Sequence, residues 1–305
     1  MGARDTKLRG WRRFAVALWP APSDPQMLGD MEIDATAMLA CIEELRRTSG
    51  VHVTATHLAG RAVAHALTVE PDLNVTLHGD RLRRGDRVDI AFIVTFGAGR
   101  EQAGLTLADV GRRSAVDVAQ ELIERAAGAR ENAEPGFDRA GRLADHMPLR
   151  VVRALLRVGV WASVDRGWDL RAIGIQPGGF GSAIVTSLGG MGIDHGYPLL
   201  TELGRVPIAI AIGRIADRPV AEDGHVVVRP MLTLSASLDH RYLDGSHAAR
   251  LAAGIRAYLA DPSSFEPAGP VDREVSSTSL PSRASTPCRP IGAATFGSGE
   301  DRSAD

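Results

Sequence analysis

The sequence is poor in cysteine and in long apolar runs, and each shortage excludes a class of protein. Cys41 and Cys288 are its two cysteines, so neither a disulfide framework nor a cysteine-based metal site is expected. No apolar stretch approaches the ~20 residues that cross a bilayer, and no apolar run follows the basic residues at the start. These shortages predict a cytoplasmic protein that is neither secreted nor inserted into a membrane.

An excess of charge of either sign is also missing. The formal net charge is -2 over 305 residues, so nothing in the composition suggests nucleic acid as a partner. No Gly-x-Gly-x-x-Gly motif links a first strand to a helix, which argues against a doubly wound nucleotide-binding fold. With 44% hydrophobic residues, the chain can still bury one large core or two small ones.

Hydrophobic periodicity in the first half predicts alternating strands and helices without internal repeats. Asp34 and Thr56 are the expected helix caps. Ser114 is expected to start a further helix, whose inward residues are Val116, Val118, Ala119, Leu122, Ile123 and Ala126. The other expected elements are a strand over 26–33, a helix over 35–47, a second helix after residue 56, a hairpin of 73–77 with 81–83, and an apolar strand over 88–95.

The most informative stretch is Leu238-Asp239-His240-Arg241-Tyr242-Leu243-Asp244-Gly245. Residues 231–238 before it alternate between apolar and polar, which indicates a half-buried strand. After it, apolar residues recur at helical spacing until Asp261-Pro262, and Ser246 can cap this helix. His240 is therefore predicted to lie at a strand-to-helix corner, where a general base can be presented.

Asp-His-Arg-x-x-Asp-Gly after such a strand resembles the active-site signature of the dihydrolipoamide acyltransferase catalytic domains of 2-oxo-acid dehydrogenase complexes. The core of that family is shared with chloramphenicol acetyltransferase. The resemblance covers residues 8–266, is strongest over 181–262, and implies a chloramphenicol acetyltransferase-like α/β fold: a two-layer sandwich with a mixed β-sheet. Three further motifs follow the family's order and spacing: Val185–Gly192, Ile208–Ile215 and Asp223–Pro230.

The expected organisation is a flexible N-terminus over 1–7, an acyltransferase catalytic domain over 8–266, and a tail over 267–305. The tail is rich in Ser, Pro, Gly and Thr, so we expect it to be disordered. No lipoyl domain precedes the catalytic region, so the chain is not expected to carry a covalent lipoyl group.

Residues 135–179 form a predicted helical insertion, longer than the connection expected in the family. Within it, Arg150, Arg153 and Arg157 share one face of a helix from Pro148 to Trp161, and apolar residues surround the rest. The pattern suits a surface helix, a lid over an acyl pocket, or a contact with a membrane surface. We favour the surface helix and do not expect membrane contact.

Acyl transfer between thiols requires a thiolate, yet a free thiol has a pKa of about 8.5 and is mostly protonated at neutral pH. A neutral imidazole can accept that proton and return it to the leaving group, and His240 is the predicted base. The tetrahedral oxyanion needs a hydroxyl donor, for which Thr186 and Ser187 are the candidates. Neighbouring strand residues face opposite ways, so only one can serve. The family resemblance implies that it is Thr186.

Asp244 is the third predicted site residue. The resemblance implies that it pairs with Arg9 or Arg12 and so braces the catalytic corner, while a favourable charge at a helix N-terminus is an equal alternative. Asp194-His195 and Asp239-His240 lack a third ligand at suitable spacing, so no metal is predicted. No cofactor-binding residue is assigned, because Gly189, Gly190 and Gly192 are expected to form a turn.

The predicted function is CoA-dependent acyl transfer from acyl-CoA, as substrate, to a thiol or another small acceptor, with His240 as base. By resemblance the protein is a homotrimer with the active site between subunits, His240 of one chain facing Thr186 of the next. We expect a discrete trimer, since a polar tail replaces the C-terminal contacts of the family's cages. Two alternatives stay open: a core that acts on a lipoyl domain of another chain, and a non-catalytic trimeric scaffold.

Overall fold

The computed structural model describes residues 24–78, 81–96, 101–131, 147–166, 168, 180–200, 205–241 and 243–266. These residues belong to one unit, Met1–Pro270. The predicted N-terminus and tail, and much of the predicted insertion, lie outside the described residues.

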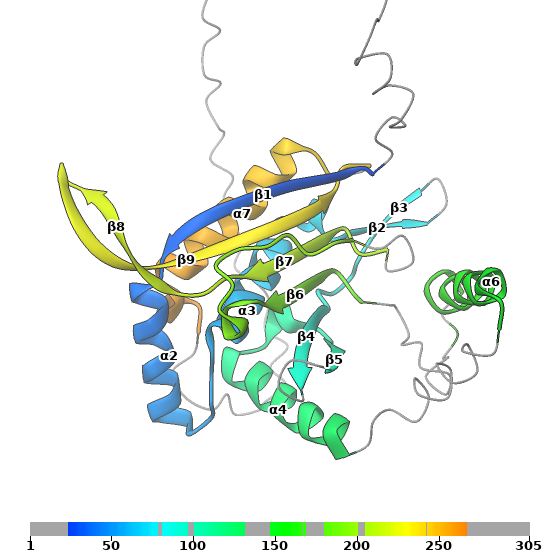
Figure 1. The fold of residues 1–305 in the computed structure, drawn as a ribbon, viewed down its shortest axis with the longest axis horizontal. Coiled ribbons are helices and arrows are strands. Elements are labelled where there is room, and N and C mark those ends of the chain that lie inside the picture. Colours follow the sequence, from blue (N-terminus) through cyan, green and yellow to red (C-terminus); the bar gives the residue numbers. More distant parts are fainter. Residues whose placement is uncertain are drawn as a thin grey trace, which may run out of the picture. The chain divides into compact units, whose positions relative to one another are not determined.

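A seven-stranded mixed sheet organises this unit (Figure 1). Its order is β1-β9-β7-β6-β4-β5, with β8 paired to β9 beside this path. The central strands β4, β6 and β7 are parallel, and the remaining pairs are antiparallel. The strands are β1 Gln26–Asp34, β4 Ile90–Phe96, β5 Glu101–Leu107, β6 Ala183–Ser187, β7 Ile208–Ile212, β8 Ala216–Glu222 and β9 His225–Asp239. A separate hairpin pairs β2 Val75–His78 with β3 Arg81–Arg84.

Four helices pack on the sheet: α2 Thr36–Ser49, α3 Ala55–Val69, α4 Ala115–Glu131 and α7 Gly245–Ala260. Helix α3 is central, since it contacts β4, β6 and each of the other three helices. Its approach to the sheet is close: a side chain at Gly60 would lie 2.4 Å from the Phe92 ring. A fifth helix, α6 Leu149–Val160, is followed directly by a π-helical turn, Trp161–Asp165. Short 3-10 turns are Pro71–Leu73, Val110–Arg112, Gly189–Met191 and Pro262–Ser264.

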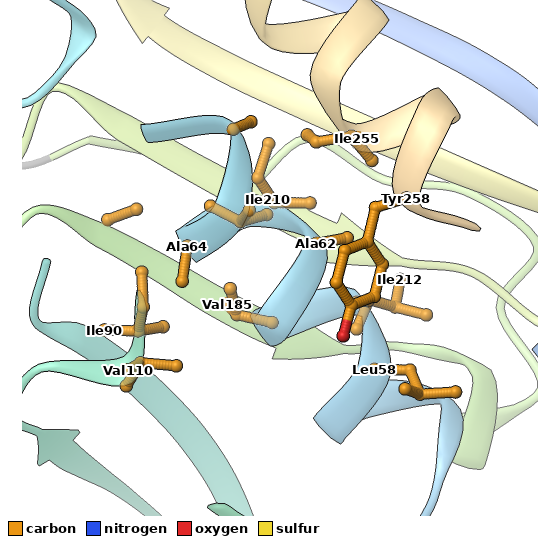
Figure 2. Close-up of a cluster of buried hydrophobic side chains, with 14 of the residues drawn as sticks. Leu58, Ala62, Ala64, Ile90, Val110, Val185, Ile210, Ile212, Ile255 and Tyr258 are labelled. Atoms are coloured by element: carbon orange, nitrogen blue, oxygen red, sulfur yellow. The ribbon is translucent and has the colours of Figure 1, made fainter. Parts of the chain in front are cut away.

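The hydrophobic core lies between the sheet and these helices (Figure 2). Alternate residues of β6, β7 and β9 face the helices, and each buried aliphatic side chain contributes roughly 1.5–3 kcal/mol. The core is therefore one-sided, which makes this a two-layer α/β fold as predicted. Representative members are Val185, Ile210, Ile212, Leu58, Ala62, Ile255 and Tyr258.

A buried polar network closes the core next to α7. The Arg61 Nε donates to Glu266 Oε1 at 3.0 Å, and the Tyr258 hydroxyl donates to the same carboxylate. The other carboxylate oxygen accepts from the Ala115 backbone N at 2.6 Å. Arg61 and Glu266 are both buried, so each charge depends on its partner.

Helix caps depart from the sequence prediction at three places. The cap of α3 is Thr54, whose backbone N donates to His57 Nδ1 at 3.0 Å, so Thr56 was wrong. Helix α2 starts one residue later than expected, and the Asp34 carboxylate still accepts from the Thr36 N at 2.8 Å. The cap of α7 is Asp244, so Ser246 was wrong as well.

The remaining predictions for the first half were correct in part. Ser114 caps α4, because its hydroxyl accepts from the Asp117 N at 3.1 Å. Ile123 was wrong, since it is exposed and does not face the core. Strand β5 was not predicted, although Ala103, Leu105 and Leu107 alternate with more polar residues and both leucines are buried.

Candidate active site

The corner between β9 and α7 is held by backbone and side-chain bonds around His240. The His240 backbone N donates to Pro25 O at 2.7 Å, and the Leu243 N donates to Asp239 O at 3.0 Å. The buried Asp239 carboxylate accepts from the Arg241 Nε at 2.9 Å and from the Arg241 backbone N at 3.1 Å. This clamp was not predicted as part of the site, although the sequence Asp-His-Arg carries it.

The imidazole of His240 has one nitrogen occupied and one available. Its Nδ1 lies 2.8 Å from the backbone carbonyl oxygen of Leu243. A carbonyl can only accept, so Nδ1 carries the hydrogen, and the lone pair of the neutral ring is on Nε2. The residue itself is exposed. His240 thus presents Nε2 as a proton acceptor at the surface of this chain.

Asp244 acts as the N-terminal cap of α7. Its Oδ1 lies 2.7 Å from the Ser246 hydroxyl and 2.7 Å from His247 Nδ1, and it accepts from the backbone N of both residues. The Ser246 hydroxyl bond first, then the bonds from His247, hold the pKa of Asp244 far below its ordinary value. Asp244 therefore is a negative charge at the N-terminus of a helix, which was one of its two predicted roles. Pairing with Arg9 or Arg12 stays a prediction, since both lie outside the described residues.

Thr186 and Ser187 lie on opposite faces of the sheet. Val185 points into the core beneath the helices (Figure 2), so the next residue, Thr186, faces the other side and Ser187 turns back. On that other side Thr186 is flanked by Ile93 of β4 and Ala211 of β7. The role of the Thr186 hydroxyl stays a prediction.

The segment after β6 packs over the face on which Thr186 lies. The Tyr197 hydroxyl donates to Asp30 Oδ1 at 2.7 Å, and the Leu200 N donates to Gln26 Oε1 at 2.8 Å. Gln26 and Asp30 occupy this face of β1, and Ser235 and Ser237 of β9, which share it, are fully buried. Sequence reasoning missed these contacts because their partners are far apart along the chain.

The glycines of this segment form a turn, as expected. A 3-10 turn spans Gly189–Met191, and Gly192 follows with a φ of 77°, a left-handed conformation that favours glycine. Asp194 is paired with Arg214, whose Nε lies 2.9 Å from Oδ1, and this bond lowers the pKa of Asp194. Within the described ranges no group of three His, Cys, Asp or Glu residues could hold a metal ion.

Thr186 and His240 are well separated within one chain. Strand pairing places Thr186 level with Ala211 of β7 and Ser235 of β9. His240 lies beyond the end of β9, about 16 Å farther along that strand and two strands away, which gives a separation of roughly 19 Å. A single acyl group cannot contact both residues in one chain. A surface hollow on α2, lined by Ala40, Glu43, Glu44, Arg46 and Arg47, contains neither residue.

Comparison with known proteins relates the part of the chain that carries His240 to one family. Residues 178–266 match the family of 2-oxoacid dehydrogenases acyltransferase (catalytic domain). The match falls on the segment whose motifs carry the resemblance, and it agrees with the recognition made from them.

Relatives and a solved structure agree with this assignment. The dihydrolipoyllysine-residue acetyltransferase component of the acetoin cleaving system of Bacillus subtilis (strain 168) is 26% identical over 86% of this chain and 57% of its own length. The lipoamide acyltransferase component of the branched-chain alpha-keto acid dehydrogenase complex of Pseudomonas putida is 41% identical over 27% of this chain and 19% of its own. This chain thus spans little more than half of the longer match.

The structural neighbour supports the fold. A probable dihydrolipoamide acetyltransferase from Listeria monocytogenes 4b F2365 superposes with a TM-score of 0.58 at 19% sequence identity. The match covers 90% of this chain and 99% of that one, so the fold of such enzymes extends across the described unit.

Proposed function

We propose that this chain is a CoA-dependent acyltransferase that moves an acyl group between CoA and a thiol acceptor. One observation carries the proposal: His240, inside the family-matched segment, has its Nδ1 fixed by the Leu243 carbonyl and its Nε2 left to take a proton. The tautomer that this bond selects is the one a general base requires.

In the proposed reaction, the acceptor thiol gives its proton to His240 Nε2 while its sulfur attacks the thioester carbonyl carbon. The carbonyl becomes a tetrahedral oxyanion. Collapse of this intermediate breaks the bond to the CoA sulfur, and the imidazolium returns its proton to that thiolate. The cycle leaves an acylated acceptor, free CoA and a neutral histidine, and the base is worth ~10² to 10⁴ in rate.

We place the Thr186 hydroxyl at the oxyanion of this intermediate. Because Thr186 and His240 are roughly 19 Å apart in one chain, the proposal requires that they come from two copies. A homotrimer supplies such a site at each subunit boundary, as the family resemblance implies. A mass of three chains in light scattering supports a discrete trimer, and a mass of 24 or more chains would contradict it.

The acceptor is proposed to be a lipoyl group carried by another chain. The relatives' names, dihydrolipoyllysine-residue acetyltransferase and lipoamide acyltransferase, favour this chemistry over other small thiols. We further propose a cytoplasmic location, which the scarcity of cysteine supports.

The test is a measurement of acyl transfer from acetyl-CoA to free dihydrolipoamide, in which the released CoA is quantified. His240→Ala should lower the rate by roughly 10² or more, because the acceptor thiol loses its base. His52→Ala, at an exposed position outside the site, is the matched control and should leave the rate unchanged. Folding and oligomeric mass should persist in both variants.

Two results would overturn the proposal. An unchanged rate in His240→Ala would remove the histidine from the mechanism. Absence of transfer by the unmodified protein with every acyl-CoA tried would favour a non-catalytic trimeric scaffold.

A further inference from the structure

Helix α6 has a fully segregated surface. In its sequence, Leu-Arg-Val-Val-Arg-Ala-Leu-Leu-Arg-Val-Gly-Val, the three arginines fall within about 60° of one another on a helical projection. The large apolar residues occupy the remaining arc, and the helix contains no acidic residue. The helix is therefore cationic along one side and aliphatic along the other.

The apolar side of α6 is exposed. Val151, Leu155, Leu156 and Val158 retain between 42% and 60% of their accessible surface, which is unusual for four aliphatic residues on one short helix. Trp161 follows at 41%, and the Arg166 guanidinium lies 4.8 Å from its ring centroid. An aromatic residue with a cation beside it suits the boundary between water and lipid headgroups.

The exposure of these side chains reverses the expectation from the sequence, and we propose that α6 lies on an anionic lipid surface, with its aliphatic side among the acyl chains and its arginines at the phosphate level. A cationic, strongly amphipathic helix with Leu and Val on its apolar side and a Trp at its end resembles the form that interfacial helices take. Arginine supplies forked donors that match phosphate oxygens, so charge complementarity selects an acidic headgroup. The attachment is peripheral, because no helix in the described part of the chain is long and apolar enough to cross a bilayer.

A protein partner fits this face less well. Twelve residues make a helix face about 18 Å long and about 10 Å wide. The helix thus offers at most 12 residues, whereas a stable protein interface uses about 20–30 residues from each partner. A lipid surface has no minimum contact area, and it gains from each buried methylene and each neutralised arginine separately.

The experiment is flotation of the full chain with vesicles of phosphatidylcholine containing about one third phosphatidylglycerol, beside vesicles of phosphatidylcholine alone. We expect binding to the anionic vesicles, weak binding to the neutral ones, and loss of binding as salt rises, since headgroup attraction is screened. Failure to bind anionic vesicles would overturn the proposal. Acyl transfer to free dihydrolipoamide does not depend on this contact. Absence of acyl transfer would therefore contradict the proposed function and not the proposed contact with lipid.

Matched variants separate charge from apolar contact. Arg153→Glu should weaken binding to anionic vesicles about tenfold, whereas Arg256→Glu, the same charge change on exposed α7 surface, should change it little. Leu155→Gln should also weaken binding about tenfold, with Ile123→Gln on exposed α4 surface as its control. Equal losses in the controls would contradict a role of α6. A different result would be that the unmodified protein does not bind vesicles and that Leu155→Gln lowers the oligomeric mass. This result would show that the apolar side of α6 contacts a second copy of the chain.

Discussion

Helices α7 and α6 are built from similar residues, yet the apolar side of α7 is buried and that of α6 is exposed. Both carry large aliphatic residues and Arg at helical spacing. In α7 the apolar residues Leu251, Ile255 and Leu259 are buried against α3 and the sheet. In α6 the equivalent residues, among them Leu155 and Val158, are exposed. Amphipathic spacing therefore specifies a helix and its two sides, but it does not specify what the apolar side contacts.

Truncation of the buried ion pair next to α7 should have the largest effect on stability. Glu266→Ala leaves the Arg61 guanidinium buried without its carboxylate, so the free energy of unfolding should fall by about 3–5 kcal/mol. Tyr258→Phe removes one hydrogen bond from the same carboxylate and should cost about 1 kcal/mol. Urea unfolding measures both. If both variants lost the same small amount of unfolding free energy, the buried pair of Arg61 and Glu266 would not be formed in solution.

The two helices can be compared directly by the same truncation on each. Leu251→Ala in α7 should lower the free energy of unfolding by about 2–5 kcal/mol, because it opens a cavity in the core. Leu155→Ala in α6 should change it by less than about 0.5 kcal/mol. A large loss from Leu155→Ala would mean that α6 packs on the protein and would weaken the inferred contact with lipid.

Acid should weaken the α3 side of the core through His57. Burial, then the charges of His52 and Arg46, lower the pKa of His57 to about 4. The unfolded chain, with a histidine pKa of 6.5, therefore binds this proton more readily, so stability falls as the pH drops from 6.5 to 4. The contribution is about 3 kcal/mol.

His57→Gln should flatten this part of the pH profile. Glutamine at this position keeps an acceptor for the Thr54 backbone N, so the helix cap survives while the titrating group is lost. Urea unfolding of both proteins at several pH values between 4 and 7 gives the comparison. Identical profiles would show that His57 is not the group responsible.

Substitutions on the two faces of the sheet should differ in their effect on the rate of acyl transfer. Thr186→Ala should lower the rate of acyl transfer by about 10², because the hydroxyl faces away from the helices toward the proposed oxyanion. Ser187→Ala, on the helix side, should leave that rate nearly unchanged. Steady-state rates with acetyl-CoA and dihydrolipoamide test the pair, and a reversed order would place Ser187 at the oxyanion.

Much of the fold could be predicted because its signals are local. The alternation before His240 and the helical spacing after it depend on neighbouring residues alone. Helix α7 follows its spacing closely, and β9 ends as predicted but begins earlier, at His225. The caps at Thr54 and Asp244 were misplaced because several Ser, Thr and Asp residues near each helix start satisfy the same pattern.

The sequence by itself determined the alternating elements, the position of His240 at a corner, and the two unlike sides of α6. The tertiary structure decided which nitrogen of His240 is available, that Glu266 closes the core, and that Thr186 lies far from His240 within one chain. Periodicity reports which way a side chain points relative to its neighbours. Partners are set by packing between segments distant along the chain, and such packing leaves no local pattern.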